Sequence, residues 1–193
     1  MVDINSVFSS LEGSCLAIYY GGSRVDPVID NPHDYDYICF SKRLHAQKLL
    51  RSLIKHKFRS TRSTNKKEKK IVTNLNDFSQ IRKYPYTQIT WFSYLDLLMI
   101  KLVGEDICPK TDIIYTHRSE FISCLKEKAN DLICGKMQNQ KRWYHLLRGA
   151  YILINNSYEV TPEQKQEINI LHDLAEGYEQ LIIKTADLVN NLQ

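Results

Sequence analysis

The spacing of the apolar residues changes near Pro109. Before this proline, short runs of strand-forming residues alternate with polar stretches, whereas after it the apolar residues recur at the intervals of amphipathic helices. These helical patterns cover roughly residues 117–134, 139–155 and 163–191. We therefore expect an α+β protein, with a strand-containing domain at residues 1–108 and an all-helical domain at residues 109–193.

The first domain contains two compact apolar runs that predict strands at Cys15–Tyr20 and Tyr35–Phe40. A polar loop with two prolines lies between them. We expect further strands at residues 71–72 and 86–92. We expect helices at residues 4–11, 42–56 and 95–103. In the second domain, Thr161 and Pro162 suit the N-cap and the first helical position of the last helix.

The composition is that of an ordinary globular protein. The 193 residues include 26 Lys and Arg against 22 Asp and Glu, with 43% hydrophobic residues, which argues against a disordered chain or a disulfide scaffold. The formal net charge of +4 permits contact with phosphates. It is lower than expected for a protein that binds nucleic acid through charge alone.

The sequence also bears on the compartment. Its apolar runs fall short of the roughly 18 residues that a membrane-spanning helix requires. The N-terminal segment MVDINSVFSS lacks the basic and apolar regions of a secretory signal. The five scattered cysteines fit buried free thiols in a reducing compartment and match no zinc-binding pattern. We expect a cytoplasmic protein that does not contact a membrane.

The segment from Tyr19 to Cys39 carries the candidate chemistry. Asp34 and Asp36 are one residue apart at the start of a predicted strand, where alternation places both on one face. Two carboxylates so close repel each other unless a cation lies between them, and a hard ion such as Mg²⁺ prefers oxygen ligands. The Gly-Gly-Ser turn after the preceding strand supplies backbone N–H groups and a hydroxyl that suit phosphate oxygens.

The order of strand, Gly-Gly-Ser turn, loop and Asp-Tyr-Asp strand resembles the nucleotidyltransferases of the DNA polymerase β-like superfamily. With Arg24 after the turn, it looks most like the bacterial and phage predicted-nucleotidyltransferase branch. The resemblance implies a small mixed sheet followed by a helical domain, with the active cleft between them. It implies that Gly22 and Ser23 contact the β- and γ-phosphates while Asp34 and Asp36 coordinate Mg²⁺ or Mn²⁺.

The activity that the resemblance implies is metal-dependent transfer of a nucleoside monophosphate from a nucleoside triphosphate, expected to be ATP, to a hydroxyl acceptor with release of pyrophosphate. The acceptor is left open and includes RNA and protein. The family also places a third carboxylate on a later strand, but the predicted strand at 86–92 carries Gln88 and Thr90 instead. Asp77 and Asp96 are the alternatives. Loss of this acid leaves open a nucleotide-binding regulatory module with weak or no catalysis.

The predicted helix at 139–155 adds a possible phosphate-binding face. Lys141, His145 and Arg148 fall on one side of it. Its apolar side consists of Trp143, Leu146, Leu147, Ala150, Tyr151 and Ile154. In the resembling branch such a helix faces the active cleft, so these three residues, with Arg24 beside the turn, are candidate nucleotide-binding residues. An ordinary solvated polar face is the alternative.

The stretch from Lys55 to Lys70 is almost wholly basic and hydroxylic and predicts an exposed hairpin. Such a hairpin could contact the phosphates of RNA or DNA. A nucleic-acid-binding protein is therefore a further alternative function.

Overall fold

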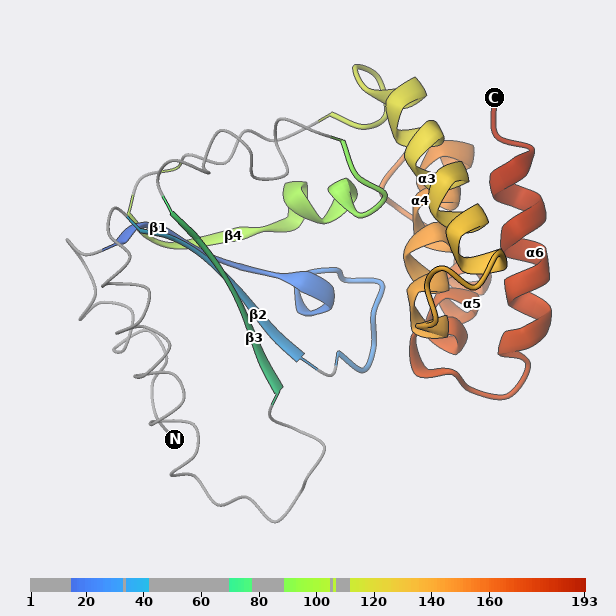
Figure 1. Ribbon diagram of the computed structural model, residues 1–193, viewed down its shortest axis with the longest axis horizontal. Coiled ribbons are helices and arrows are strands. Elements are labelled where there is room, and N and C mark those ends of the chain that lie inside the picture. The colour runs from blue at the N-terminus through green and yellow to red at the C-terminus, as the bar shows by residue number, and fades with distance from the viewer. Residues whose placement is uncertain (1–14, 33, 42–69, 78–88, 105, 107–111) are drawn as a thin grey trace, which may run out of the picture. The chain divides into compact units, whose positions relative to one another are not determined.

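The computed structural model describes residues 15–32, 34–41, 70–77, 89–104, 106 and 112–193, and in β2 and β3 it describes the backbone (Figure 1). The chain forms two compact units. The sheet unit comprises Met1–Asp26, Pro32–Thr87 and Leu98–Pro109. The helical unit comprises Pro27–Asn31, Gln88–Leu97 and Lys110–Gln193. The predicted domain boundary after residue 108 stays a prediction, as it lies outside the described residues.

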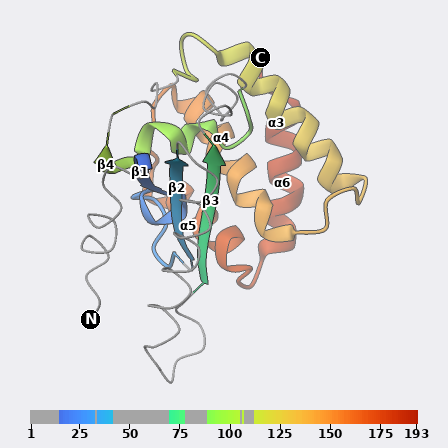
Figure 2. The same ribbon diagram turned by 60° about the vertical axis from the view of Figure 1, so that its left-hand side comes forward.

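The described part of the sheet unit is a four-stranded sheet in the order β3-β2-β1-β4 (Figure 2). The strands are β1 (Cys15–Gly21), β2 (Asp34–Ser41), β3 (Lys70–Asp77) and β4 (Ile100–Gly104). β1 is antiparallel to both β2 and β4, whereas β2 and β3 are parallel, so the sheet is mixed. The strands predicted at 15–20 and 35–40 are confirmed, and the short one at 71–72 lies within β3.

β1 lies between β2 and β4, and two of its described side chains are buried. Ala17 is inaccessible and Tyr19 is 2% exposed. The two residues are two positions apart, so they share one face of the strand. Tyr19 also donates a hydrogen bond to Asp106 Oδ1 at 3.0 Å. By contrast, Ile100 and Lys101 of β4 are exposed, as expected for the last strand of the described sheet.

Two predictions between residues 86 and 103 are wrong. The expected helix at 95–103 is instead a 3₁₀ helix, η4 (Ser93–Leu98), followed by strand β4. The pairing of β4 with β1 outweighs the local helical pattern. The described part of the expected strand at 86–92 is coil and turn, in which Thr90 N–H donates to Ser93 Oγ at 2.9 Å. The helices expected at 4–11 and 42–56 and the hairpin at 55–70 lie outside the described residues, apart from Lys70 at the start of β3.

The helical unit is organised around one central helix. Its elements are α3 (Arg118–Ile133), η5 (Gln140–Arg142), α4 (Trp143–Asn155), α5 (Pro162–Asp173) and α6 (Tyr178–Asn190). Helix α4 packs against α3, α5 and α6, and its residues from Trp143 to Leu153 are buried apart from His145. The described helices include none that is both long enough and apolar enough to cross a bilayer.

The expected helix at 163–191 is in fact two helices, α5 and α6. Leu174 and Gly177 both have left-handed backbone, with φ of 51° and 89°. A left-handed residue ends a helix because it cannot continue the right-handed path. The apolar periodicity crosses the break because both helices bury residues in the same core, including Leu171 and Val189.

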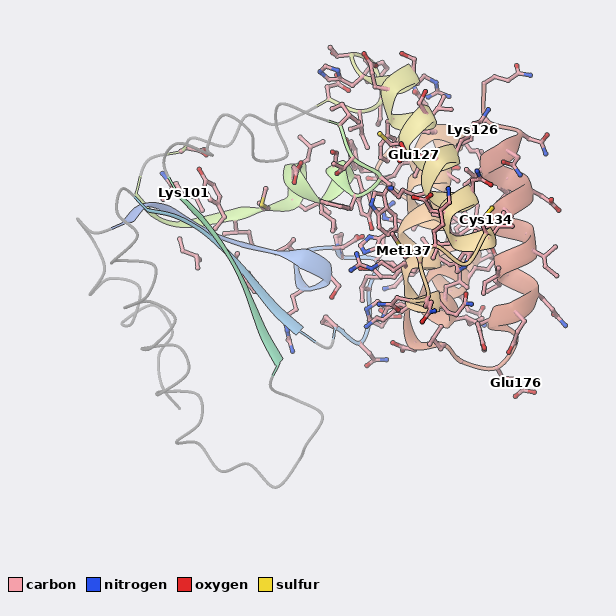
Figure 3. All side chains as sticks on the ribbon, in the orientation of Figure 1. Lys101, Lys126, Glu127, Cys134, Met137 and Glu176 are labelled. Atoms are coloured by element: carbon pink, nitrogen blue, oxygen red, sulfur yellow. The ribbon has the colours of Figure 1, made fainter. Side chains whose placement is uncertain are left out.

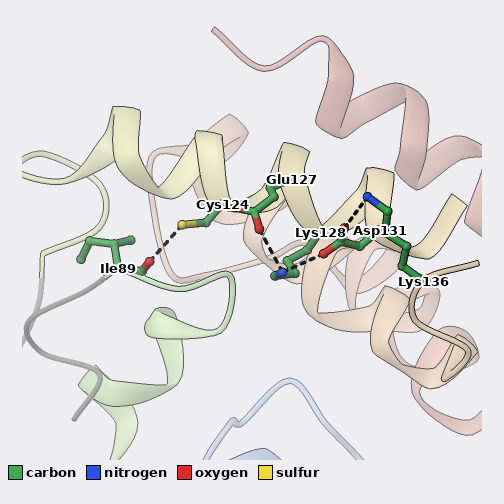
Figure 4. A network of polar contacts seen from close by, with 6 residues as sticks. All are labelled: Ile89, Cys124, Glu127, Lys128, Asp131 and Lys136. Carbon is green, nitrogen blue, oxygen red and sulfur yellow. Dashed lines mark hydrogen bonds and ion pairs between the residues drawn. The ribbon is translucent and has the colours of Figure 1, made fainter. Parts of the chain in front are cut away.

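The described cysteines differ in their exposure. Cys124 is partly buried in α3, where burial raises the pKa of its thiol, and the thiol donates to the Ile89 carbonyl at 2.9 Å (Figure 4). This bond ties the segment before η4 to α3. Cys134 is exposed just after α3, so the expectation of buried thiols is wrong for this residue (Figure 3). In the same helix, Lys128 forms ion pairs with Glu127 and Asp131 at 3.1 and 2.8 Å.

The start of α5 confirms the predicted cap. Thr161 Oγ1 accepts a hydrogen bond from Gln164 N–H at 3.2 Å, and Gln164 Oε1 accepts one from Thr161 N–H at 3.0 Å. Pro162 occupies the first turn. Glu163 stands at the same end, where its own backbone N–H lowers the pKa of the carboxyl. The capping interactions of Thr161 therefore define where helix α5 begins.

We expect Thr161→Ala to lower the free energy of unfolding by about 1 kcal/mol, because the backbone N–H of Gln164 loses its acceptor. Urea unfolding followed by circular dichroism measures the change. Ser123→Ala is the matched control, since it removes an exposed hydroxyl inside α3 and should change stability by less than about 0.5 kcal/mol. Equal midpoints for the two variants would contradict the role of the cap.

Candidate active site: the turn after β1 and the start of β2

A tight turn follows β1. Gly21 is extended, with φ of −146° and ψ of −153°, and Gly22 has a left-handed φ of 71°. Residues Gly22–Arg24 form the 3₁₀ helix η1, and Val25 N–H donates to the Gly22 carbonyl at 3.3 Å. A left-handed conformation costs an L-residue roughly 1–2 kcal/mol but is accessible to glycine, which explains the glycine at this position.

The pairing of β1 with β2 determines where the acidic pair stands. Gly21 is the register partner of Asp36, and Asp34 is the first residue of β2. Directly opposed residues of antiparallel strands have Cα atoms about 5 Å apart. The backbone of the Asp-Tyr-Asp strand thus runs beside the turn that begins at Gly22. Positions 34 and 36 are two apart, so they share one face of β2.

The residue types at this end of the sheet fit a hard divalent cation. Two carboxylates supply the oxygen ligands that Mg²⁺ prefers, and the turn beside them supplies N–H groups for phosphate. Among the side chains that the structure describes, no three His, Cys, Asp or Glu residues are grouped so as to hold a metal ion. The side chains of Asp34 and Asp36 are outside that set, so the fit rests on ligand chemistry and on backbone position.

The register of β3 bears on the third carboxylate. Asp77 is the register partner of Ser41. Ser41 is five residues from Asp36 along β2, a distance of about 17 Å at the rise of a β-strand. Asp77 is therefore too far from the acidic pair to share a metal ion with it. The β3 residues opposite Asp34 and Asp36 are Lys70 and Val72, neither of which is acidic.

Asp96, the other alternative, lies in η4 and belongs to the helical unit. It is 7% exposed, and its Oδ2 has no hydrogen-bond partner among the described residues. Burial raises the pKa of this carboxyl to about 7. The environment of Asp96 thus favours the neutral acid, whereas metal ligation and proton abstraction require the carboxylate.

His145 does not contribute a positive charge. Its ring lies 3.9 Å from that of Tyr144 and 5.1 Å from that of Trp91, measured between centroids, and Nδ1 shares a hydrogen bond with the Tyr94 hydroxyl at 2.9 Å. Although part of its surface remains accessible, burial lowers the pKa of His145 to about 3, with smaller contributions from the nearby charges of Arg142, His172 and Lys141. The imidazole is neutral at physiological pH.

Arg148 does not lie on a solvated polar face of α4, which was the alternative interpretation of this side of the helix. This residue is 1% exposed, and its guanidinium donates to the Tyr158 carbonyl at 2.8 Å and lies 5.7 Å from the centre of the Tyr94 ring. Lys141 is half-buried. It belongs to η5 and therefore precedes α4 instead of lying within it. Ile154, assigned to the apolar side, is 50% exposed. Within the helical unit, α4 is a core helix; nucleotide contacts by its polar residues stay a prediction.

One part of the motif was overlooked in the sequence. The loop between the turn and β2 is not wholly polar, because Val28 and Ile29 are 5% and 7% exposed and belong to the helical unit's core. Asn169 of α5 bonds to the backbone of this loop. The two adjacent apolar residues between the prolines were a sequence signal for burial. No sequence signal identified Asn169 as the hydrogen-bond partner of the loop.

We expect the stability of the protein to fall as pH rises from about 4 to about 7, because folded Asp96 retains its proton in a range where the unfolded chain has lost it. The loss amounts to at most about 4 kcal/mol. Asp96→Asn should remove this part of the pH dependence and be more stable than the parent at pH 8. Urea unfolding at pH 5 and pH 8 measures both. The exposed Asp187→Asn is the control, and a parent-like pH profile for Asp96→Asn would contradict the assignment.

No protein-family model matches the sequence. No curated protein sequence matches it. Among solved structures, the chain is similar to the spectinomycin adenyltransferase AAD(9) from Enterococcus faecialis, solved with ATP and spectinomycin. The TM-score is 0.58 at 11% sequence identity, and the match covers 97% of this chain and 98% of the other. At this identity the likeness shows the fold, so the chain has a fold found in a nucleotidyltransferase.

Proposed function

We propose that the protein is a metal-dependent nucleotidyltransferase of the predicted-nucleotidyltransferase branch, which transfers a nucleoside monophosphate to a hydroxyl acceptor. The observation that carries the proposal is the pairing of Gly21 with Asp36, which puts the Asp-Tyr-Asp strand next to a left-handed glycine turn. The similarity in fold to an adenyltransferase supports it. ATP is proposed as the donor because that neighbour was solved with ATP.

The turn is proposed to bind the triphosphate. Backbone N–H groups from Gly22 onward and the hydroxyl of Ser23 would hold phosphate oxygens, and Arg24 at the end of η1 would add positive charge. Lys141 is a further candidate from the helical unit. These contacts would hold the α-phosphorus in line between the acceptor oxygen and the departing pyrophosphate.

Asp34 and Asp36 would hold Mg²⁺ or Mn²⁺. When bound, the ion supplies positive charge for the α-phosphate and for the pyrophosphate that leaves. Positions 34 and 36 share one face of β2, at the end of the strand that pairs with the residue before the turn, so their two carboxylates would be the ligands of the ion. The acceptor oxygen would form a bond to the α-phosphorus as the bond to pyrophosphate breaks, and the acceptor hydroxyl would give its proton to solvent water.

A second candidate is a nucleotide-binding regulatory module with weak turnover. Lys70 and Val72 stand opposite the acidic pair in β3, and the register excludes Asp77, so no third carboxylate adjoins the pair along β3. Without a general base the transfer would be roughly 10²–10⁴-fold slower. Calorimetry with ATP and Mg²⁺ separates the candidates when combined with a pyrophosphate-release assay, because binding without release favours the module.

We expect Asp34→Asn and Asp36→Asn each to reduce transfer at least about 10²-fold, because each removes a charged ligand of the ion. The assay uses ATP labelled in the α-phosphate, with RNA, protein and spectinomycin as acceptors in separate reactions. Asp77→Asn is the matched control, since it makes the same chemical change in β3 opposite Ser41 and should leave the rate unchanged. Transfer by the Asp34→Asn, Asp36→Asn double variant at the parent rate would refute the proposal.

A further inference from the structure

The loop that joins the two halves of the motif is anchored in the helical unit. Residues Pro27–Asn31 belong to that unit, although the turn before them and β2 after them belong to the sheet unit. Val28 and Ile29 are buried in its core. Prolines at positions 27 and 32 fix φ at each end and limit the conformations of the segment.

Asn169 of α5 holds the backbone of this loop through both ends of its amide. Its Oδ1 accepts from Asp30 N–H at 2.8 Å, and its Nδ2 donates to the Val28 carbonyl at 2.8 Å. The same Nδ2 also donates to the Lys165 carbonyl within α5 at 2.9 Å. The side chain therefore satisfies a donor and an acceptor of the loop at once, as a neighbouring strand would.

Two weaker contacts accompany this anchor. Lys165 Nζ lies 2.7 Å from Asp30 Oδ1, and Asn31 Nδ2 donates to Asp173 Oδ2 at 3.4 Å. Both loop side chains are exposed, and ion pairs in water contribute little to stability. Removing Asn169, by contrast, leaves the Asp30 N–H and the Val28 carbonyl without this partner. Replacing Asn169 therefore removes two hydrogen bonds that hold the backbone of the loop to α5.

The anchor is close to the acidic pair along the chain. Asn31 precedes Asp34 by three residues, which span at most about 11 Å when fully extended. Asp30 and Asn31 are therefore joined to the first residue of β2 by a short connection. On the other side, Asp26 and Val25 connect the loop to η1 and the turn.

We propose that Asn169 is a positioning residue for the metal site: by holding residues 28–30, it fixes the entry of the chain into β2 and hence the location of Asp34. The inference rests on the proposed function, since it assumes that Asp34 binds a metal ion. Residues that orient metal ligands without touching the ion typically change metal affinity about 10–100-fold when they are replaced.

The test compares Asn169→Leu with the parent in three measurements. Hydrogen exchange of the Asp30 amide measures whether the loop is held by Asn169. Electron paramagnetic resonance measures the binding of Mn²⁺ in the presence of ATP and so tests the metal site. Thermal unfolding measures stability. We expect at least tenfold faster exchange at Asp30 and about 10–100-fold weaker Mn²⁺ binding. In the transfer assay, the Mn²⁺ concentration for half-maximal rate should rise by a similar factor.

Asn155→Leu is the matched control. The Asn155 amide bonds to the Glu159 carbonyl and to the side chain of Gln164, all within the helical unit and none in the loop. It should lower thermal stability without weakening Mn²⁺ binding. Equal weakening of Mn²⁺ binding in both variants would overturn the positioning role, because loss of stability alone would then explain the effect.

The remaining outcomes separate this inference from the proposed function. If the parent binds Mn²⁺ with ATP, and Asn169→Leu binds it equally well despite faster exchange at Asp30, the positioning role is wrong and the proposed function stands. If the Asp30 amide is no better protected in the parent than in the variant, the anchor itself is overturned. If the parent binds no Mn²⁺ in the presence of ATP, both the proposed function and this inference fail.

Discussion

The candidate site depends on the antiparallel pairing between β1 and β2. A shift of one residue would turn the side chains of the shifted strand to the opposite face of the sheet, and Asp36 would no longer lie opposite Gly21. The burial of Ala17 and Tyr19 opposes such a shift of β1, because it would move these two side chains out of their buried row. Hydrophobic burial along β1 thereby determines where an acidic pair stands relative to a glycine turn. The position of the candidate site at the end of the sheet therefore depends on the packing of Ala17 and Tyr19 within β1.

The sequence predicted the parts of the fold that depend on local pattern. The apolar run at residues 15–20 and the run beginning after Asp34 are strands because their residues favour extended backbone over a short distance. The start of α5 was predictable because Thr161 and Pro162 act within one turn. The placement of the glycine turn beside the Asp-Tyr-Asp strand follows from the same local patterns, together with the antiparallel pairing of β1 with β2.

The errors concern features that depend on contacts between distant residues. The strand at 100–104 exists because it pairs with β1, whose paired residues are at least 80 positions away. Arg148 has the sequence position of an exposed cation, but the Tyr158 carbonyl and the Tyr94 ring provide a buried environment for it. His145 is neutral because burial, which includes packing against the distant Trp91 ring, lowers its pKa. No pattern in the sequence near Arg148 or His145 identifies these partners, so periodicity alone could not predict the charge that α4 presents.

The path of the chain has a consequence for how the protein could be divided. Segments 27–31 and 88–97 belong to the helical unit, although the residues before and after them belong to the sheet unit. A fragment beginning at residue 112 would lack Val28, Ile29, Trp91 and Tyr94, all of which are buried in the helical core. Neither unit is therefore a continuous piece of the gene. Recombination that exchanges one unit for a homologous one would have to replace three separate stretches of sequence together.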